Sequence, residues 1–222
     1  MANARVAGFT VLFYMAAGIT REFLIGRATN AEGTAATLAR IAAHALDVRV
    51  TILLGLLECF SALVLGVALY GITRDVDNEL AVLALVCRVC EGVLEAIGIP
   101  VTLGLLWLAT AGAGAGAPDA ATANVLGAFY LMPAQHSMIG GPFFAVGSMI
   151  FSWLLLRGRM IPIPLAWLGV LVSILLVVTL PLQIAGFLSG PLTGYMWMLM
   201  VAFQVPLGLW LLIKGVATPA TR

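Results

Sequence analysis

Long runs of apolar residues separated by short polar segments make up most of the chain. A helix of about twenty apolar residues is long enough to cross the hydrocarbon core of a bilayer. The pattern therefore predicts an all-α, polytopic membrane protein, with six transmembrane helices in one bundle and a single domain over residues 1–222. The expected helices span about residues 6–25, 49–72, 78–109, 121–156, 161–187 and 191–215.

The third expected helix is the most informative because it is apolar yet carries Arg88, Glu91 and Glu95. Their spacing of i, i+3 and i+7 places the three charges on one face of a helix. A charge near the centre of a bilayer costs roughly 3 kcal/mol on insertion scales, so these side chains need partners or a wet cavity. We expect this face to form the polar centre of the bundle.

Glu58 is the one deep charge on the second expected helix. The short turn after that helix returns the chain antiparallel, which brings Arg88 within about one helical turn of Glu58 and predicts a contact between them. Glu91 is expected to pair with Arg88 as well. Arg21 and Glu22 end the first helix, where they either anchor it at the interface or line the mouth of a cavity.

The fourth expected helix is too long for one straight span, and its middle, YLMPAQHSMIGGPFF, contains the prolines and glycines that bend or break a helix. Gln135 and His136 lie in this broken region. Irregular backbone at membrane depth is tolerated where it lines protein or a wet cavity. His136 is therefore either a second site residue or a buried histidine bonded to a neighbouring helix.

Composition agrees with a membrane protein: 62% of the residues are hydrophobic and only 9% are charged, against about 25% charged in soluble domains. The mean hydropathy is +1.10. The net charge of +1 and the lack of a basic run give no indication of a nucleic-acid partner. The first apolar run resembles a signal peptide but has no cleavage site after it, so we interpret it as a membrane helix.

The distribution of basic residues predicts the orientation in the membrane. One set of ends and turns carries Arg5, Arg74, Arg157, Arg159, Lys214 and Arg222, whereas the opposite side carries Arg21, Arg27, Arg40 and Arg49, all in or beside the first long loop. This balance favours both termini on the cytoplasmic side of the membrane.

Cysteine chemistry adds little to the prediction. Cys87 and Cys90 form a CxxC pair within an apolar run, and a redox or metal role is one interpretation. Two sulfurs do not complete a zinc site, and no HxxxH or HExxH spacing is present. Burial as small apolar residues is the other interpretation. We expect no metal and no cofactor.

Four segments resemble a widespread bacterial family of small six-helix membrane proteins, described as a domain of unknown function. They are ARVAGFTVLFYMAAGI, ALYGITRDVDNELAVLALVCRVCEGVLEA, LLLRGRMIPIPLAWLGVL and LGLWLLIKGV. The most specific element is Arg88-x-x-Glu91, followed by the basic, proline-containing turn RGRMIPIPLAWLG. The family often carries a carboxylate on its last helix, where this chain has Gln204. The resemblance implies the fold and supplies no reaction.

A carboxyl in a low-dielectric cavity without a permanent cation favours its protonated form, which is a general acid. We therefore expect an integral-membrane enzyme that cyclises or isomerises a lipophilic, terpenoid-like or lipid substrate. The expected catalytic residues are Glu95 as the acid, Glu91, His136 and Glu58. The expected substrate-binding residues are Arg88, Gln135, Tyr130, Tyr195 and Trp197. A proton-coupled transporter or channel, and an accessory protein locked by buried ions, are the alternatives.

Overall fold

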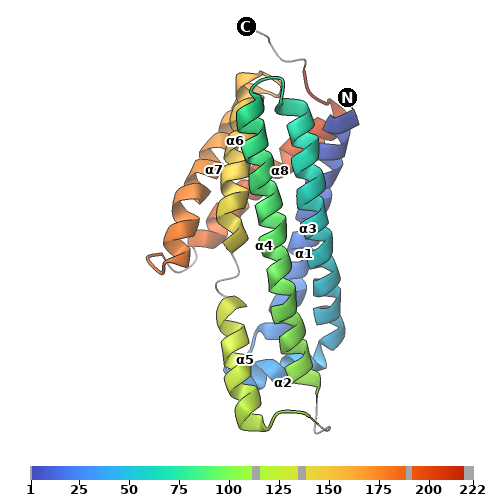
Figure 1. The fold of residues 1–222 in the computed structure, drawn as a ribbon, viewed down its shortest axis with the longest axis vertical. Helices are drawn as coiled ribbons and strands as arrows, with labels where there is room; N and C mark the ends of the chain where they lie inside the picture. The colour runs from blue at the N-terminus through green and yellow to red at the C-terminus, as the bar shows by residue number, and fades with distance from the viewer. Residues whose placement is uncertain (1, 112–115, 135–138, 189–191, 218–222) are drawn as a thin grey trace.

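The computed structural model describes residues 2–111, 116–134, 139–188 and 192–217, and its secondary structure is entirely helical. Six helices are long: α1 (Ala2–Thr29), α3 (Ala45–Thr73), α4 (Asn78–Thr110), α6 (Gly140–Arg157), α7 (Ile163–Ile184) and α8 (Leu192–Ile213). The two shorter helices are α2 (Thr34–Ala43) and α5 (Ala120–Ala134). Figure 1 shows α1, α3 and α4 running nearly the whole length of the molecule, with α6, α7 and α8 alongside only one part of it.

The long helices form a closed ring. Each packs against two others, in the order α1, α3, α4, α6, α7, α8 and back to α1. The main apolar core lies inside this ring. At the other end of the molecule, α2 and α5 pack against α4 around a second, smaller core that includes Ile41, Val48 and Leu105.

Five helices are long and apolar enough to cross a membrane: α1, α3, α6, α7 and α8, counting α8 from Gly194. α4 is not among these five, although it takes its place in the ring between α3 and α6. Six membrane spans therefore remain a prediction.

The fourth expected helix, over residues 121–156, is two helices in the structure, α5 and α6. The residues between them, 135–138, lie outside the described part of the chain. A proline removes a backbone donor and clashes with the preceding turn, and Pro133 lies at the end of α5 while Pro142 lies in the first turn of α6. Each of these two helices thus has a proline near the end that adjoins residues 135–138.

Helices α1 and α8 approach each other closely because both carry glycine at the crossing. A Cβ on Gly8 would lie 2.5 Å from the backbone nitrogen of Leu212 and 2.7 Å from the carbonyl oxygen of Gly208. Small residues at helix crossings in a bilayer allow backbones to pack by van der Waals contact. This contact closes the ring between its first and last helices.

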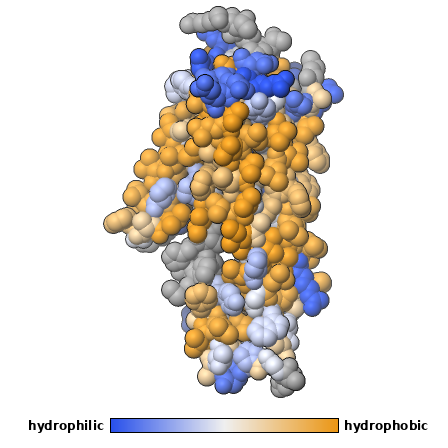
Figure 2. All heavy atoms as spheres, viewed as in Figure 1, coloured by the Kyte–Doolittle hydropathy of each residue, from blue (hydrophilic) through white to orange (hydrophobic). Residues whose placement is uncertain are grey.

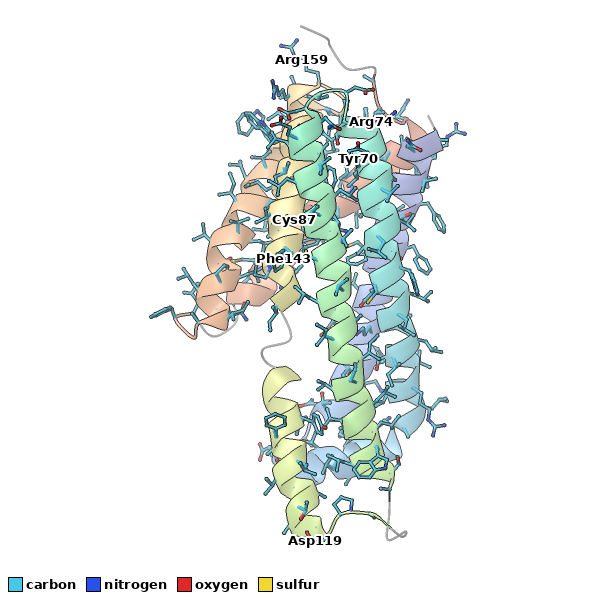
Figure 3. All side chains as sticks on the ribbon, in the orientation of Figure 1. Tyr70, Arg74, Cys87, Asp119, Phe143 and Arg159 are labelled. Atoms are coloured by element: carbon cyan, nitrogen blue, oxygen red, sulfur yellow. The ribbon has the colours of Figure 1, made fainter. Side chains whose placement is uncertain are left out.

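The surface has the distribution expected for a protein in a bilayer. Figure 2 shows a broad hydrophobic band, with hydrophilic residues gathered beyond it at the end where α1 begins and α8 finishes. Arg74 and Arg159 lie at this end, and Asp119 lies at the opposite one (Figure 3). There Asp119 accepts a hydrogen bond from the backbone N–H of Thr122 at 2.7 Å, and this bond lowers the pKa of Asp119.

The glycine contact between α1 and α8 gives a first prediction. Gly8→Ala should lower the free energy of unfolding by about 1–3 kcal/mol, because its methyl group would overlap backbone atoms that cannot rotate away. Gly26→Ala on the same helix is the matched control, since no atom lies within 4 Å of its Cβ position. Thermal unfolding of the detergent-purified variants measures the difference, and equal stability of the two would contradict the described crossing.

Candidate functional site: a carboxylate–arginine cluster between α1, α3 and α4

One face of α1 carries the polar groups that meet α3 and α4. Tyr14, Gly18 and Arg21 are spaced i, i+4 and i+7, so they share this face. Glycine at position 18 leaves room for a neighbouring carboxylate, because a Cβ there would lie 3.0 Å from Oε1 of Glu58. A phenol and a guanidinium therefore project from α1 toward the acidic residues of the other two helices.

Arg21 joins α1 to both α3 and α4. Its Nη1 lies 2.7 Å from Oε2 of Glu58 and 3.4 Å from Oε2 of Glu95. The side chain of Glu58 is 6% exposed, whereas those of Arg21 and Glu95 are 27% and 26% exposed. Glu58 thus has a short ion pair in a buried position, whereas Glu95 has a longer ion pair in a more exposed position.

A second ion pair lies deeper in the bundle, on α4 itself. Nη1 of Arg88 is 2.8 Å from Oε2 of Glu91, and the two side chains are 2% and 1% exposed. The hydroxyl of Tyr14 donates a hydrogen bond to the other carboxylate oxygen, Oε1 of Glu91, at 2.9 Å. Glu91 therefore accepts a hydrogen bond on Oε1, whereas its Oε2 faces the Arg88 charge without a hydrogen bond.

The guanidinium of Arg88 is enclosed by aromatic rings and by small residues. Its Cζ lies 5.7 Å from the ring centroid of Tyr14 and 5.2 Å from that of Phe144, within the range of a cation–π contact. Gly66 and Gly147 make room for its stem, since a Cβ at either position would come within 3.4 Å of Arg88 carbon atoms. Four helices thus contribute to the surroundings of one cation.

The two ion pairs lie at different depths along α4. At 1.5 Å per residue, Arg88 is about 15 Å from the start of the helix at Asn78, and Glu95 is about 25 Å from it. A hydrocarbon core about 30 Å thick that begins near Asn78 would hold Arg88 near its centre and Glu95 near its far edge. With the bilayer placed in this way, the longer ion pair, between Arg21 and Glu95, is the one closer to the opposite interface.

The cluster contains one more carboxyl than it has cations. Glu58, Glu91 and Glu95 face Arg21 and Arg88, and each arginine has one close partner. Glu95 shares Arg21 with Glu58 at the longest distance of the three. The group closest to being without a counter-charge is therefore Glu95.

A cavity of about 30 Å³ lies beside Arg88, inside the ring of helices. Its polar lining consists of Arg88, Ser148, Ser152 and Gln204, and the other lining residues are apolar. Two nitrogens of Arg88, Nε and Nη2, and the Oε2 atom of Glu91 are buried without a hydrogen-bond partner in the described part of the protein. The arginine thus faces the Glu91 carboxylate with one nitrogen and is unsatisfied at the other two.

The structure corrects one pairing that the sequence predicted. Arg88 does not contact Glu58; its partner is Glu91, and Glu58 pairs with Arg21 instead. The prediction was wrong because it placed Arg21 at the interface, whereas α1 continues beyond it to Thr29 and turns its side chain toward α3. The expected pair of Arg88 with Glu91 is confirmed.

The other expected site residues are dispersed. Gln135 and His136 lie outside the described residues. Tyr130 packs against the second core, where its ring lies over Gly104, away from the cluster. Tyr195 is 63% exposed on α8.

Trp197 is the expected aromatic residue that comes nearest to the cluster. Its ring lies 5.6 Å from that of Phe144, which in turn covers Arg88. Reasoning from the sequence missed Tyr14, the pairing of Arg21 with Glu58, and Phe144. For the first two, the spacing of Tyr14, Gly18 and Arg21 along one face was a usable signal.

Cys87 is buried, Cys90 is half-buried, and both are free thiols. In Figure 3, Cys87 lies part-way along α4. Within the described residues, no group of three or more His, Cys, Asp or Glu side chains is arranged to hold a metal ion.

The chain belongs to the family described as "Domain of unknown function (DUF4386)", which matches residues 6–215. No match is found among curated proteins or among solved structures. The description of the family assigns no reaction.

The Arg21–Glu58 pair gives a second prediction. Arg21→Gln should destabilise the protein by about 3 kcal/mol, because it leaves the Glu58 carboxylate buried without a cation. The double variant Arg21→Gln with Glu58→Gln should be more stable than the sum of the single effects implies, with a coupling energy of about 1–3 kcal/mol. Chemical unfolding in detergent gives these values.

The exposed pair Arg74–Asp75, 3.8 Å apart, is the control for this cycle and should show a coupling energy of about 0–1 kcal/mol. Equal coupling in the two pairs would mean that Arg21 and Glu58 do not form the described contact.

The Tyr14 hydroxyl gives a third prediction. Tyr14→Phe should cost about 1.5–3 kcal/mol, because Glu91 loses a hydrogen bond while the ring over Arg88 is retained. Tyr70→Phe is the matched control: its hydroxyl bonds to Asn78 at the exposed end of the bundle, where water replaces it. A similar loss in both variants would contradict a special role of the buried hydroxyl.

Proposed function

We propose that this DUF4386 protein is an integral-membrane enzyme in which Glu95 is an exchangeable acid acting on a lipophilic substrate. The observation that carries the proposal is the unequal number of charges in the cluster: three carboxyls share two guanidiniums. Of the three carboxyls, Glu95 lies farthest from its guanidinium. A carboxyl without its own cation in a low-dielectric site favours its neutral form, and a neutral carboxyl donates a proton.

In this proposal the remaining members of the cluster position the helices and take no part in the reaction on the substrate. Arg21 and Glu58 form the close pair that positions the Glu95 carboxyl at 3.4 Å from the guanidinium. Arg88, Glu91 and Tyr14 form a second, fully buried set that holds α1 against α4. Movement of a proton on Glu95 then leaves the packing of the bundle unchanged.

The chemistry that fits is protonation of an alkene or epoxide, followed by loss of a proton from a neighbouring carbon. The carboxyl gives its proton to the substrate and the conjugate base accepts one back, so the acid is regenerated and the substrate is isomerised or cyclised. A lipophilic substrate reaches Glu95 from the bilayer, since its side chain is 26% exposed near the far edge of the core. His136 is proposed as the proton relay: it precedes Gly140 by four residues, and the Cβ position of Gly140 lies 3.6 Å from Oε1 of Glu95.

A second candidate function, proton-coupled transport, is favoured by the course of the polar groups along the bundle. They run from the half-exposed Glu95 and Arg21 to the buried Arg88, which borders the cavity. Polar groups that extend from an interface to the interior are the arrangement that a proton-linked carrier needs.

The location is also a proposal. Arg5, Arg74, Arg157, Arg159 and Lys214 belong to the helix ends and turns at the end of the bundle where α1 begins. Basic residues are in excess on the cytoplasmic side of membrane proteins, so we place both termini in the cytoplasm of a bacterial cell, with the bundle in its inner membrane.

The exchangeable proton gives a fourth prediction, measured by infrared spectroscopy of the protein in lipid nanodiscs, in a halide-free gluconate buffer. The wild type should show a protonated-carboxyl band that disappears as the pH is raised, and Glu95→Gln should remove this change. Glu79→Gln is the matched control, because Glu79 is an exposed carboxyl in the first turn of the same helix. Persistence of the band change in Glu95→Gln would transfer the acid role to another carboxyl and overturn the proposal.

The enzyme and transport candidates separate in a comparison of cellular lipids. Cells that express the wild type or Glu79→Gln should share a change in lipophilic metabolites that is lost with Glu95→Gln. A titrating Glu95 without any such change would favour transport. A Glu95→Gln protein that shows neither effect and loses stability would instead indicate that the cluster only locks the helices.

A further inference from the structure

The cavity beside Arg88 is a separate feature from the Glu95 carboxyl, and it is built around a cation whose hydrogen bonds are incomplete. Arg88 is 1% exposed, and only its Nη1 meets a carboxylate. Its Nε and Nη2 have no partner within the part of the chain that the structure describes. A buried, unsatisfied N–H group of a charged side chain is costly, so a further acceptor beside the guanidinium would stabilise it.

The lining of the cavity defines which acceptor suits it. Besides Arg88, the polar lining is Ser148 and Ser152 from α6 and Gln204 from α8, all of which are able to donate a hydrogen bond. No acidic side chain lines the cavity among the described residues. The serine and glutamine side chains also accept hydrogen bonds, but with a guanidinium as its one charged lining group the site is complementary to a negatively charged or strongly accepting guest.

The size of the cavity limits the guest to one small species. A cavity needs about 10–15 Å³ to hold one water molecule, and this one measures about 30 Å³. A halide ion has nearly the size of a water molecule, whereas a lipid, a sugar or a nucleotide is far too large. The candidates are therefore water and a small monovalent anion.

The charges around Arg88 decide when an anion is favoured. The titratable groups that face it are Glu91 and Cys87 from α4 and Tyr14 from α1; the cavity-lining residues of α3, α6 and α8 include none. Farther along the cluster, Arg21 faces Glu58 and Glu95. An additional negative charge is disfavoured while all three carboxylates are ionised. When Glu91 accepts a proton, however, Arg88 loses its counter-charge and an anion in the cavity replaces it.

We infer that the cavity is a binding site for one small monovalent anion of halide size, which enters together with a proton. Neither ion is stable there alone: the anion meets carboxylates in excess of cations, and the proton leaves a buried guanidinium unpaired. Bound together they add no net charge to the interior. Because binding equilibria are linked reciprocally, the anion should strengthen proton binding by the same factor as the proton strengthens anion binding.

The test is a titration of the full chain in nanodiscs with chloride or bromide, against gluconate at equal ionic strength. The apparent Kd for the halide should decrease on going from mildly alkaline to mildly acidic pH, by up to about tenfold per pH unit if one proton accompanies each anion. A crystal grown with bromide should show the anomalous signal of one ion next to Arg88.

Variants of the cavity wall test the location. Gln204→Leu removes a donor while keeping most of the volume and should weaken halide binding at least several-fold. Gln204→Glu places a carboxylate in the cavity and should abolish binding. Gln183→Leu on α7 does not touch the cavity and is the matched control. Thermal unfolding of each variant verifies that the bundle is intact.

The outcomes are distinct. Water alone in the cavity, with equal responses to chloride and gluconate, would overturn the inference. Halide binding that is independent of pH would overturn the coupling to a proton. Glu95→Gln separates this inference from the proposed function, because it removes the acid of that proposal and leaves the cavity unchanged, so halide binding should persist in it.

Discussion

The enclosure of the Arg88 guanidinium is the constraint on which the centre of the bundle depends. An ion of this size loses several kcal/mol of hydration when it leaves water, and removal of its partner would leave the whole cost uncompensated. The side chain is 2% exposed, so its compensation must come from neighbouring helices. Glu91, the Tyr14 and Phe144 rings and the donor-lined cavity are those contributions, and they require α1, α4, α6 and α8 to meet at one place.

Packing with small residues makes this convergence possible. Gly66 on α3 and Gly147 on α6 lie against the stem of Arg88, and Gly18 on α1 lies against Glu58. In lipid, helices gain little from burying apolar surface against one another, so close backbone approach and polar contacts hold them together. Glycines and ion pairs therefore act together in this protein: the glycines allow the helices to pack closely, and the ion pairs select which helices pack against each other.

The sequence predicted the parts of the fold that depend on local pattern. The third expected helix, 78–109, agrees with α4 (Asn78–Thr110), because an apolar run follows Asp77, whose side chain accepts a hydrogen bond from the backbone N–H of Leu80 at 3.2 Å. The spacing of Arg88 and Glu91 likewise predicted their pairing. The pairs formed between helices were not predictable in this way.

Arg21 shows why pairing between helices escapes a local pattern. It follows an apolar run of the length that crosses a membrane, which suggests an interfacial residue. Only the extension of α1 to Thr29 and the antiparallel packing of α3 place it against Glu58. The partner of a deep charge depends on the relative rotation and height of two helices, and those are properties of the assembled ring.

Position along α4 then gives similar carboxylates different properties. Glu91 and Glu95 are one turn apart on the same face, yet one is 1% exposed between an arginine and a tyrosine and the other is 26% exposed beside a shared arginine. The difference follows from α6, which begins at Gly140, close to Glu95. Above that level α6 closes the ring around Glu91. Glu95, one turn farther along α4 and beside the first residue of α6, is 26% exposed and shares an arginine, and this combination of a nearby charge with access from outside is what proton exchange requires.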